Sequence, residues 1–260
     1  MNKIAIVTGG AKGIGYGSAH RLLKDGATVI ILDIDADGLA KAVKDFASFE
    51  GRIFSETVDI SSDSQVKKAI ENVGNKYGHI DFLVNCAGIQ TYGNAVETSE
   101  ETWDKTFDVN VKSMYLTAKY AIPFMQKAKG GSIVNISSVQ SLANQKGVLA
   151  YAASKGAINA LTRALAVDHA SDHIRCNAIL PASVDTPMLR ESARAFSGHK
   201  TEDEIISEWG KSHPIGRMAS IDDIGELVGF LCSDKSSFIT GSSYVIDGGL
   251  MSQIPVILPE

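Results

Sequence analysis

Short apolar runs of strand length alternate with helical patterns along all 260 residues. The first run, residues 4–7, is continuous and β-branched, which is typical of a strand buried on both faces. Such alternation predicts an α/β fold, a doubly wound parallel sheet flanked by helices on both faces. No repeat or linker divides the chain, so we predict one domain, 1–260. The expected strands are 4–7, 28–32, 53–58, 82–85, 132–137, 175–180 and 243–246, and the expected helices are 14–24, 39–46, 64–77, 99–128, 150–169, 202–209 and 221–232.

The composition argues against several classes of protein. Hydrophobic residues make up 44% and charged residues 21%, which is ordinary for a soluble globular protein. The net charge of -5 argues against a nucleic-acid partner. No apolar run approaches the roughly 18 residues of a membrane helix, and residues 1–3 leave no room for a signal peptide. We therefore expect a cytoplasmic protein. Cys86, Cys176 and Cys232 lack the spacing of metal ligands, so we expect no metal.

Residues 186–215 interrupt the alternation of strands and helices. They are polar, with two prolines and one short helical pattern at 202–209. Long excursions at the strand ends of an α/β sheet are usually lids or binding loops, so we predict a substrate lid. A solvated insertion is the alternative. The C-terminal tail, 250–260, is apolar with prolines at 255 and 259, and we expect it to dock against the domain.

A glycine cluster lies between the first strand and the first helix. Gly9, Gly13 and Gly15 allow a tight turn and a close approach to a pyrophosphate at the helix N-terminus. Asp33 ends the second strand, 18 residues after Gly15, where a carboxylate binds both ribose hydroxyls and repels a 2′-phosphate. This pattern favours NAD over NADP. Lys12 is a counter-signal, because a cation in this loop also suits a phosphate.

A proton-transfer site is indicated by Tyr151, Lys155 and Ser138. The tyrosine and the lysine are four residues apart, about one helical turn, and the serine lies thirteen residues before the tyrosine. A nearby cation favours the phenolate and lowers the pKa of the phenol, and the serine hydroxyl is suited to bind the substrate oxygen. Alone, such a pair is usually a solvated surface pair, so the prediction depends on the other motifs.

Taken in order, these motifs resemble the short-chain dehydrogenases/reductases, over nearly the whole chain. The matching set is Thr8-Gly9-x-x-x-Gly13-Ile14-Gly15, Asp59, Asn85-x-Ala87-Gly88, Asn110, Ser138, Tyr151-x-x-x-Lys155 and Pro181-x-x-x-x-Thr186. The resemblance implies a Rossmann-like fold. It also implies that Tyr151 is the acid/base, Lys155 lowers its pKa and holds the nicotinamide ribose, Ser138 positions the substrate oxygen and Asn110 anchors a relay water. The implied NAD contacts are Gly9, Lys12, Gly13, Ile14, Gly15, Asp33, Asp59, Ile60, Asn85, Ala87, Gly88, Tyr151, Lys155, Pro181, Val184 and Thr186.

Two positions depart from the family pattern. Cys86 replaces the usual second asparagine, which is expected to loosen one hydrogen bond at the strand edge. Ala182 replaces the glycine that normally follows the proline, which is expected to place a methyl group near the nicotinamide.

Several further segments, among them 181–187, 206–210 and 247–250, are similar to aldohexose dehydrogenases of this family. That similarity implies oxidation of C1 of a sugar to the lactone, a homotetramer, and a tail that helps close the sugar pocket. Long, partly apolar helices also suit packing between subunits. A reductase of 3-oxoacyl thioesters or ketones using NAD(P)H, a dehydrogenase of polyols or other alcohols, and a catalytically silent NAD-binding sensor remain as alternatives. The residues expected to contact the sugar are Gln90, Ser138, Gln140, Asn144, Gln145 and Tyr151.

Overall fold

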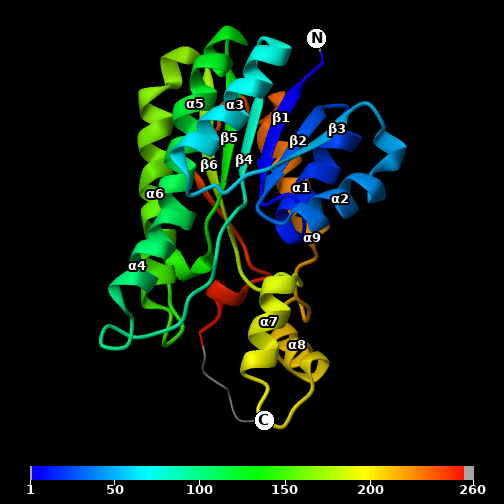
Figure 1. Cartoon of the computed structure of the whole chain (residues 1–260). Helices are drawn as coiled ribbons and strands as arrows, with labels where there is room; N and C mark the ends of the chain where they lie inside the picture. Colours follow the sequence, from blue (N-terminus) through cyan, green and yellow to red (C-terminus); the bar gives the residue numbers. More distant parts are fainter. Residues whose placement is uncertain (1, 255–260) are drawn as a thin grey trace.

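Seven parallel strands form one sheet in the order β3-β2-β1-β4-β5-β6-β7 (Figure 1). The computed structural model describes residues 2–254. All seven expected strands are present, and the prediction of a doubly wound parallel sheet is confirmed. The strands are β1 (Ile4–Thr8), β2 (Thr28–Asp33), β3 (Ile53–Thr57), β4 (Phe82–Asn85), β5 (Gly131–Ile136), β6 (Ile174–Pro181) and β7 (Ser243–Ile246).

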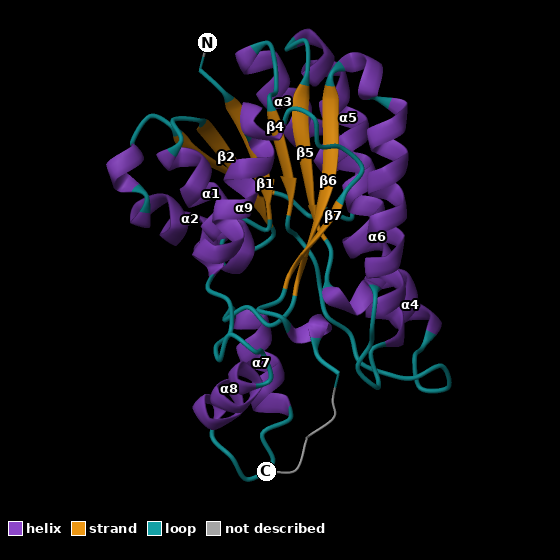
Figure 2. Ribbon diagram, turned by 180° about the vertical axis from the view of Figure 1, so that it is seen from behind, coloured by secondary structure: helices purple, strands orange, loops and turns teal. Residues whose placement is uncertain are grey.

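Helices cover both faces of the sheet (Figure 2). On one face α1 (Gly13–Lys24) packs against α9 (Ile221–Cys232), with α2 (Ala36–Asp45) beside them. On the other face lie α3 (Asp63–Tyr77), α5 (Ser113–Lys127) and α6 (Leu149–Asp168). The side chains of β1 alternate between the two resulting cores, with Ile4 and Ile6 on one side and Ala5 and Val7 on the other. Within residues 2–254, no helix is both long and apolar enough to cross a membrane.

The remaining helices lie beyond the carboxyl ends of the strands. They are α4 (Glu100–Phe107), α7 (Pro187–Ala195) and α8 (Glu202–Lys211), and the last two form most of the segment 186–215 (Figure 1). The chain passes from β1 outward to β2 and β3 and then returns to β4 on the other side of β1. Ligands of open α/β sheets bind where the strand order reverses in this way. The strand order therefore predicts a ligand site at the loops after β1 and β4.

The helix expected at 99–128 is wrong as a single element. Between α4 and α5 lies a π-helical stretch, Asp108–Lys112, with the buried Asn110 at its centre. The amide of Asn110 bonds the backbone of Ile89 twice, and these bonds accompany the departure from regular α-helical pairing. The helix α7 was also not expected. Its start is set by Thr186, whose side chain accepts a hydrogen bond from the N–H of Leu189.

A buried polar network fixes the central strands relative to the helices that carry the candidate site. Asn135 on β5 accepts a hydrogen bond from Asn85 on β4 at 2.8 Å and donates one to Thr162 on α6 at 3.0 Å. Asn85 also accepts from Thr117 on α5 at 2.8 Å. These side chains are at most 1% exposed, so each bond replaces water that the core excludes.

We predict that Asn135→Ala lowers the free energy of unfolding by about 2–4 kcal/mol, because it leaves buried groups of Asn85 and Thr162 without their partner. Urea denaturation followed by circular dichroism measures the change. Ser237→Ala, at an exposed position, is the control and is expected to change stability by less than about 0.5 kcal/mol. A loss no larger than that of the control would contradict the structural role of this network.

Candidate active site

At Gly9 and Gly15, the region between β1 and the first turn of α1 has no space for a side chain. A Cβ on Gly15 would lie 2.0 Å from the carbonyl oxygen of Gly9, and a Cβ on Gly9 would lie 2.8 Å from the nitrogen of Ala87. Gly13 has φ +59, in the region that favours glycine. The N-terminus of α1 has no side-chain cap, as is also the case at α3, α5 and α6. Uncapped N–H groups beside small residues fit an anionic group such as a pyrophosphate.

Asp33 lies at the end of β2, beside this loop. Its two carboxylate oxygens accept hydrogen bonds from the N–H groups of Ala11 and Asp35, each at 3.1 Å, and each oxygen retains capacity for another donor. Lys12 lies 3.3 Å from the carboxylate of Asp35, which offsets its positive charge. The pKa of Asp35 is lowered by the N–H of Gly38 and then by Lys12.

Three more predicted cofactor residues lie at neighbouring strand ends. Asp59 accepts hydrogen bonds from the backbone and side chain of Ser61, and these bonds lower its pKa. Ile60 is buried. The side chain of Asn85 is engaged in the buried polar network with Asn135 and Thr117. At this position a ligand would therefore contact the backbone.

Residues 181–186 lie next to the glycine loop. Pro181 ends β6, and the N–H of Ala182 continues the pairing with β7 by bonding the carbonyl of Ile246. Val184 is buried and forms a bridge with Ala219. Thr186 approaches the other loop, because a Cβ on Gly13 would lie 3.4 Å from its methyl group. The structure therefore brings the predicted cofactor segments from β1 and β6 together.

Lys155 and Tyr151 lie one turn apart on α6, as predicted. The Nζ atom of Lys155 is 5.4 Å from the centroid of the Tyr151 ring and donates a hydrogen bond to the carbonyl of Ile136 at 3.0 Å. A Cβ on Gly88 would lie 3.9 Å from the same Nζ atom, so the lysine also adjoins the loop after β4. The side chain is 5% exposed, and burial lowers the pKa of Lys155 to about 8, an effect that the thiol of Cys86 opposes.

The pKa of Tyr151 shifts in the direction opposite to the one expected from the sequence. Burial raises it to about 12, and the nearby hydroxyl of Ser138 only partly opposes this shift. The lowering expected from Lys155 is not found, because the loss of solvation on burial dominates the pKa of Tyr151. A phenol in this environment is protonated at neutral pH, so a further positive charge is needed to populate the phenolate.

Ser138 lies beside Tyr151, and Asn110 lies with Lys155 next to Gly88. Ser138 is 6% exposed and accepts a hydrogen bond from the N–H of Gln140 at 3.1 Å. Asn110 is fully buried and donates a hydrogen bond to Ser154, at 3.1 Å, as well as binding Ile89. The four predicted catalytic residues therefore belong to one connected region. Sequence analysis missed Ser154, although its position directly before Lys155 in the Tyr-x-x-Ser-Lys sequence was a signal.

The predicted sugar contacts differ in their surroundings. Gln90 and Gln140 are partly buried, whereas Asn144 and Gln145 are exposed. The side-chain oxygen of Gln140 accepts a hydrogen bond from the N–H of Gln145 at 2.9 Å, so it supports its own loop. Tyr92, which follows Gln90 by two residues, was not expected at the site, and its proximity contributes to the raised pKa of Tyr151.

The cysteines are buried as expected, with partial exposure only at Cys86. Burial raises the pKa of each of the three thiols to about 12. The Sγ atom of Cys86, which stands at the position of the family's second asparagine, lies 3.8 Å from the hydroxyl of Ser18. Within residues 2–254, no group of three or more His, Cys, Asp or Glu residues is arranged to hold a metal ion.

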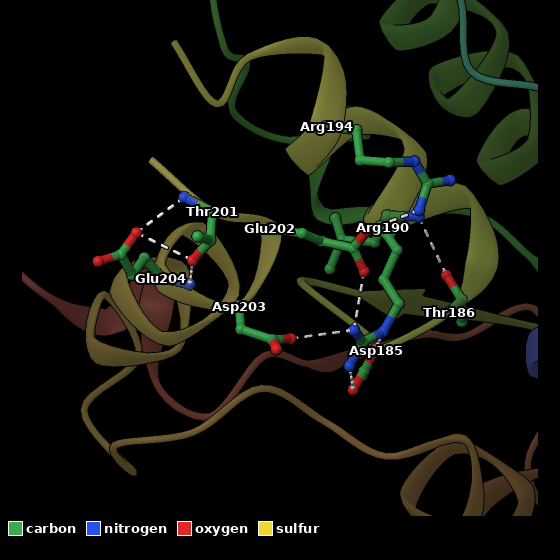
Figure 3. Close-up of polar contacts among 9 residues, drawn as sticks. Asp185, Thr186, Arg190, Arg194, Thr201, Glu202, Asp203 and Glu204 are labelled. Atoms are coloured by element: carbon green, nitrogen blue, oxygen red, sulfur yellow. Dashed lines mark hydrogen bonds and ion pairs between the residues drawn. The ribbon is translucent and has the colours of Figure 1, made fainter. Parts of the chain in front are cut away.

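The segment 186–215 is tied together by ion pairs (Figure 3). Arg190 on α7 binds both carboxylate oxygens of Asp185, at 2.6 and 2.8 Å, and reaches Glu202 on α8 at 2.8 Å. Arg194 binds the same glutamate at 2.6 Å. From the tail, Gln253 donates a hydrogen bond to the carbonyl of Ser212 at 2.8 Å. The rest of the predicted docking tail, 255–260, lies outside the described residues.

We predict that the stability cost of burying Lys155 depends on pH. Because the folded-state pKa is about 8 and the unfolded value about 10.5, the unfolded state binds the proton more tightly between these values. The free-energy cost of burying charged Lys155 is at its maximum below pH 8, and it disappears as the pH rises toward 10.5. The free energy of unfolding of the native protein should therefore gain up to about 3 kcal/mol relative to Lys155→Met over this range. Urea denaturation of both proteins between pH 7 and 10 measures the difference, and a pH-independent difference would contradict the prediction.

Comparisons with known proteins match almost the whole chain. A family model described as Enoyl-(Acyl carrier protein) reductase matches residues 9–251. The chain is 35% identical over 249 residues to the 3-oxoacyl-(acyl-carrier-protein) reductase FabG of Thermotoga maritima, covering 96% of this chain and 98% of that protein. The ligand-free aldohexose dehydrogenase AldT of Thermoplasma acidophilum is similar with a TM-score of 0.91 and 38% identity, over 100% of this chain and 98% of that one. The L-sorbose reductase of Gluconobacter frateurii, complexed with NADPH and L-sorbose, has a TM-score of 0.93 and 26% identity, over 97% and 98%.

Proposed function

The chain belongs to the short-chain dehydrogenase/reductase family of oxidoreductases, and we propose that it oxidises the C1 hydroxyl of an aldohexose to the lactone with transfer of hydride to NAD. The observation that carries the proposal is the position of Tyr151 and Lys155 beside Ser138 and next to the loop at Gly88. This arrangement suits proton transfer at an alcohol or carbonyl. The sugar class is supported by the similarity to an aldohexose dehydrogenase and by the amide side chains near Ser138.

In the proposed reaction, the C1 hydroxyl lies between Ser138 and Tyr151. When bound, NAD⁺ supplies the hydride acceptor and a positively charged ring. Tyr151 accepts the hydroxyl proton as the C1–H bond gives up its hydride, while Ser138 holds the same oxygen. We assign the lowering of the Tyr151 pKa to the charged nicotinamide ring together with Lys155, which lies 5.4 Å from the centroid of the phenol ring, because burial alone holds the phenol protonated. We assign to Asn110 the role of anchoring the proton relay. Its hydrogen bonds to Ile89 and Ser154 fix the loop after β4 relative to α6.

The choice of NAD is supported by the charges around Asp33. Its carboxylate has free acceptor capacity toward ribose hydroxyls and repels an additional phosphate. Lys12, the cation that would favour NADP, is paired with Asp35. The uncapped first turn of α1 and the positions of Gly9 and Gly15 suit the pyrophosphate, so the residues present fit the cofactor.

A second candidate is a reductase of 3-oxoacyl thioesters or ketones. It is favoured by the 35% identity to a 3-oxoacyl reductase and by the fold shared with a sugar reductase that binds NADPH. Oxidation of a polyol or another alcohol would use the same residues. A silent NAD-binding sensor is disfavoured, because Asn110, Ser138, Tyr151 and Lys155 are all present.

We also propose that the protein forms a homotetramer. Support comes from apolar side chains on the surfaces of α5 and α6, where Tyr115 is 50%, Leu149 41% and Val167 78% exposed. Such side chains suit packing between helices of neighbouring subunits.

We predict NADH formation from one or a few aldohexoses in a panel of aldoses, polyols and secondary alcohols offered with NAD⁺ or NADP⁺. Tyr151→Phe should lower kcat by at least about 100-fold, because the proton acceptor is lost. Tyr77→Phe, which removes a hydroxyl from the last residue of α3, is the matched control and should retain activity. Absence of activity with every sugar, together with NADPH-dependent reduction of a ketone or oxoacyl thioester, would overturn the proposal.

We predict that Asp33→Asn shifts the cofactor preference toward NADP⁺. The neutral amide keeps the shape of the side chain but loses the charge that binds the ribose and repels a 2′-phosphate. The ratio of kcat/KM for NAD⁺ to that for NADP⁺ should fall about 10- to 100-fold, as for hydrogen bonds to a charged group. Asp37→Asn, within α2, provides a charge-matched control and should leave the ratio unchanged. An unchanged ratio in Asp33→Asn would remove the basis for assigning NAD.

A further inference from the structure

Tyr92 lies where the loop after β4 meets the start of α6. The next residue, Gly93, accepts a hydrogen bond from the N–H of Leu149 at 3.2 Å and donates one to the carbonyl of Gly147 at 2.8 Å. Leu149 begins α6, two residues before Tyr151. The backbone beside Tyr92 is thus bonded to the backbone that positions the catalytic tyrosine.

The side chain of Tyr92 extends from this position to α7. Its hydroxyl donates a hydrogen bond to the hydroxyl of Ser192 at 2.6 Å, and its ring lies 4.9 Å from the ring of Phe196 at an interplanar angle of 73°. Ser192 is 6% exposed and donates in turn to the carbonyl of Met188. We call these two interactions, the Tyr92–Ser192 hydrogen bond and the Tyr92–Phe196 ring contact, the Tyr92–α7 contact. The edge-to-face geometry is the favourable one for aromatic rings.

Ion pairs connect the partner of Tyr92, α7, to its neighbours. Arg190 and Arg194 connect α7 to Glu202 on α8, and Arg190 also binds Asp185, which lies between the predicted cofactor contacts Val184 and Thr186 (Figure 3). Charge-assisted and bidentate bonds of this kind limit the bending of α7 relative to α8. A hydrogen bond to Ser192 therefore positions the whole helix pair.

We propose that Tyr92 is a substrate-positioning residue, which holds α7 over the catalytic Tyr151 through the Tyr92–α7 contact. The substrate is then enclosed between α7 on one side and the catalytic base, Tyr151 on α6, on the other. Both are positioned by the same paired backbone, residue 93 and residues 147–149. The influence of Tyr92 on the pKa of Tyr151 agrees with this proximity. The inference rests on the proposed function only in taking the enclosed substrate to be the alcohol that Tyr151 deprotonates.

A double-variant cycle tests this role. In Tyr92→Phe the ring contact remains and the hydrogen bond is lost, and in Ser192→Ala the other partner of the same bond is removed. Each is expected to raise KM for the sugar roughly 3- to 10-fold, with kcat changed less than about 2-fold and KM for NAD⁺ unchanged. The double variant should resemble either single variant, because both remove one bond. Tyr77→Phe, at the end of α3, is the matched control and should leave all constants unchanged.

A second measurement needs no substrate. Amide hydrogen exchange of residues 187–195 should be faster in Tyr92→Phe than in the native protein and unchanged in Tyr77→Phe. Unchanged exchange, additive effects in the double variant, or an equal rise in KM for NAD⁺ would each overturn the proposal. If the native protein reduces a ketone and no sugar is oxidised, the sugar assignment fails. The same cycle with that ketone then decides the role of Tyr92 separately.

Discussion

The catalytic side of the molecule depends on one buried amide. Asn110 bonds the backbone of Ile89 through both its oxygen and its nitrogen, and it bonds Ser154, which precedes Lys155. It thereby connects the loop after β4, which carries the predicted cofactor and sugar contacts, to the helix of the base. A fully buried amide is costly unless its groups are paired, so this geometry is strongly specified. The π-helical stretch at 108–112 is the local irregularity that accompanies it.

Much of the fold was predictable, because buried parallel strands require continuous β-branched runs, and such runs are recognisable in the sequence. The strands expected at 4–7 and 82–85 agree with β1 and β4 within one residue. The positions of Gly9 and Gly15 were equally informative, since the space around them excludes any side chain. A steric requirement of this kind is expressed in the sequence itself.

Other features depend on contacts between distant residues, which periodicity does not record. The division of the expected helix at 99–128 depends on Asn110 meeting Ile89, and the direction of the pKa shift at Tyr151 depends on how completely the fold removes water. The interaction of Tyr92 with Ser192 joins residues 100 positions apart. From sequence alone, Tyr92 is an ordinary loop aromatic, and only packing reveals its partner.

The way α7 and α8 are attached has a consequence for how enzymes of this architecture diversify. Both helices lie in one contiguous stretch, residues 187–215, and side-chain bonds from Asp185, Tyr92 and Gln253 connect that stretch to its surroundings. The base and the glycine loop belong to other segments, whose backbone is bonded within the sheet and α6. Exchange of this single stretch between homologues is thus a modular route to new substrate ranges that leaves the machinery for hydride and proton transfer intact.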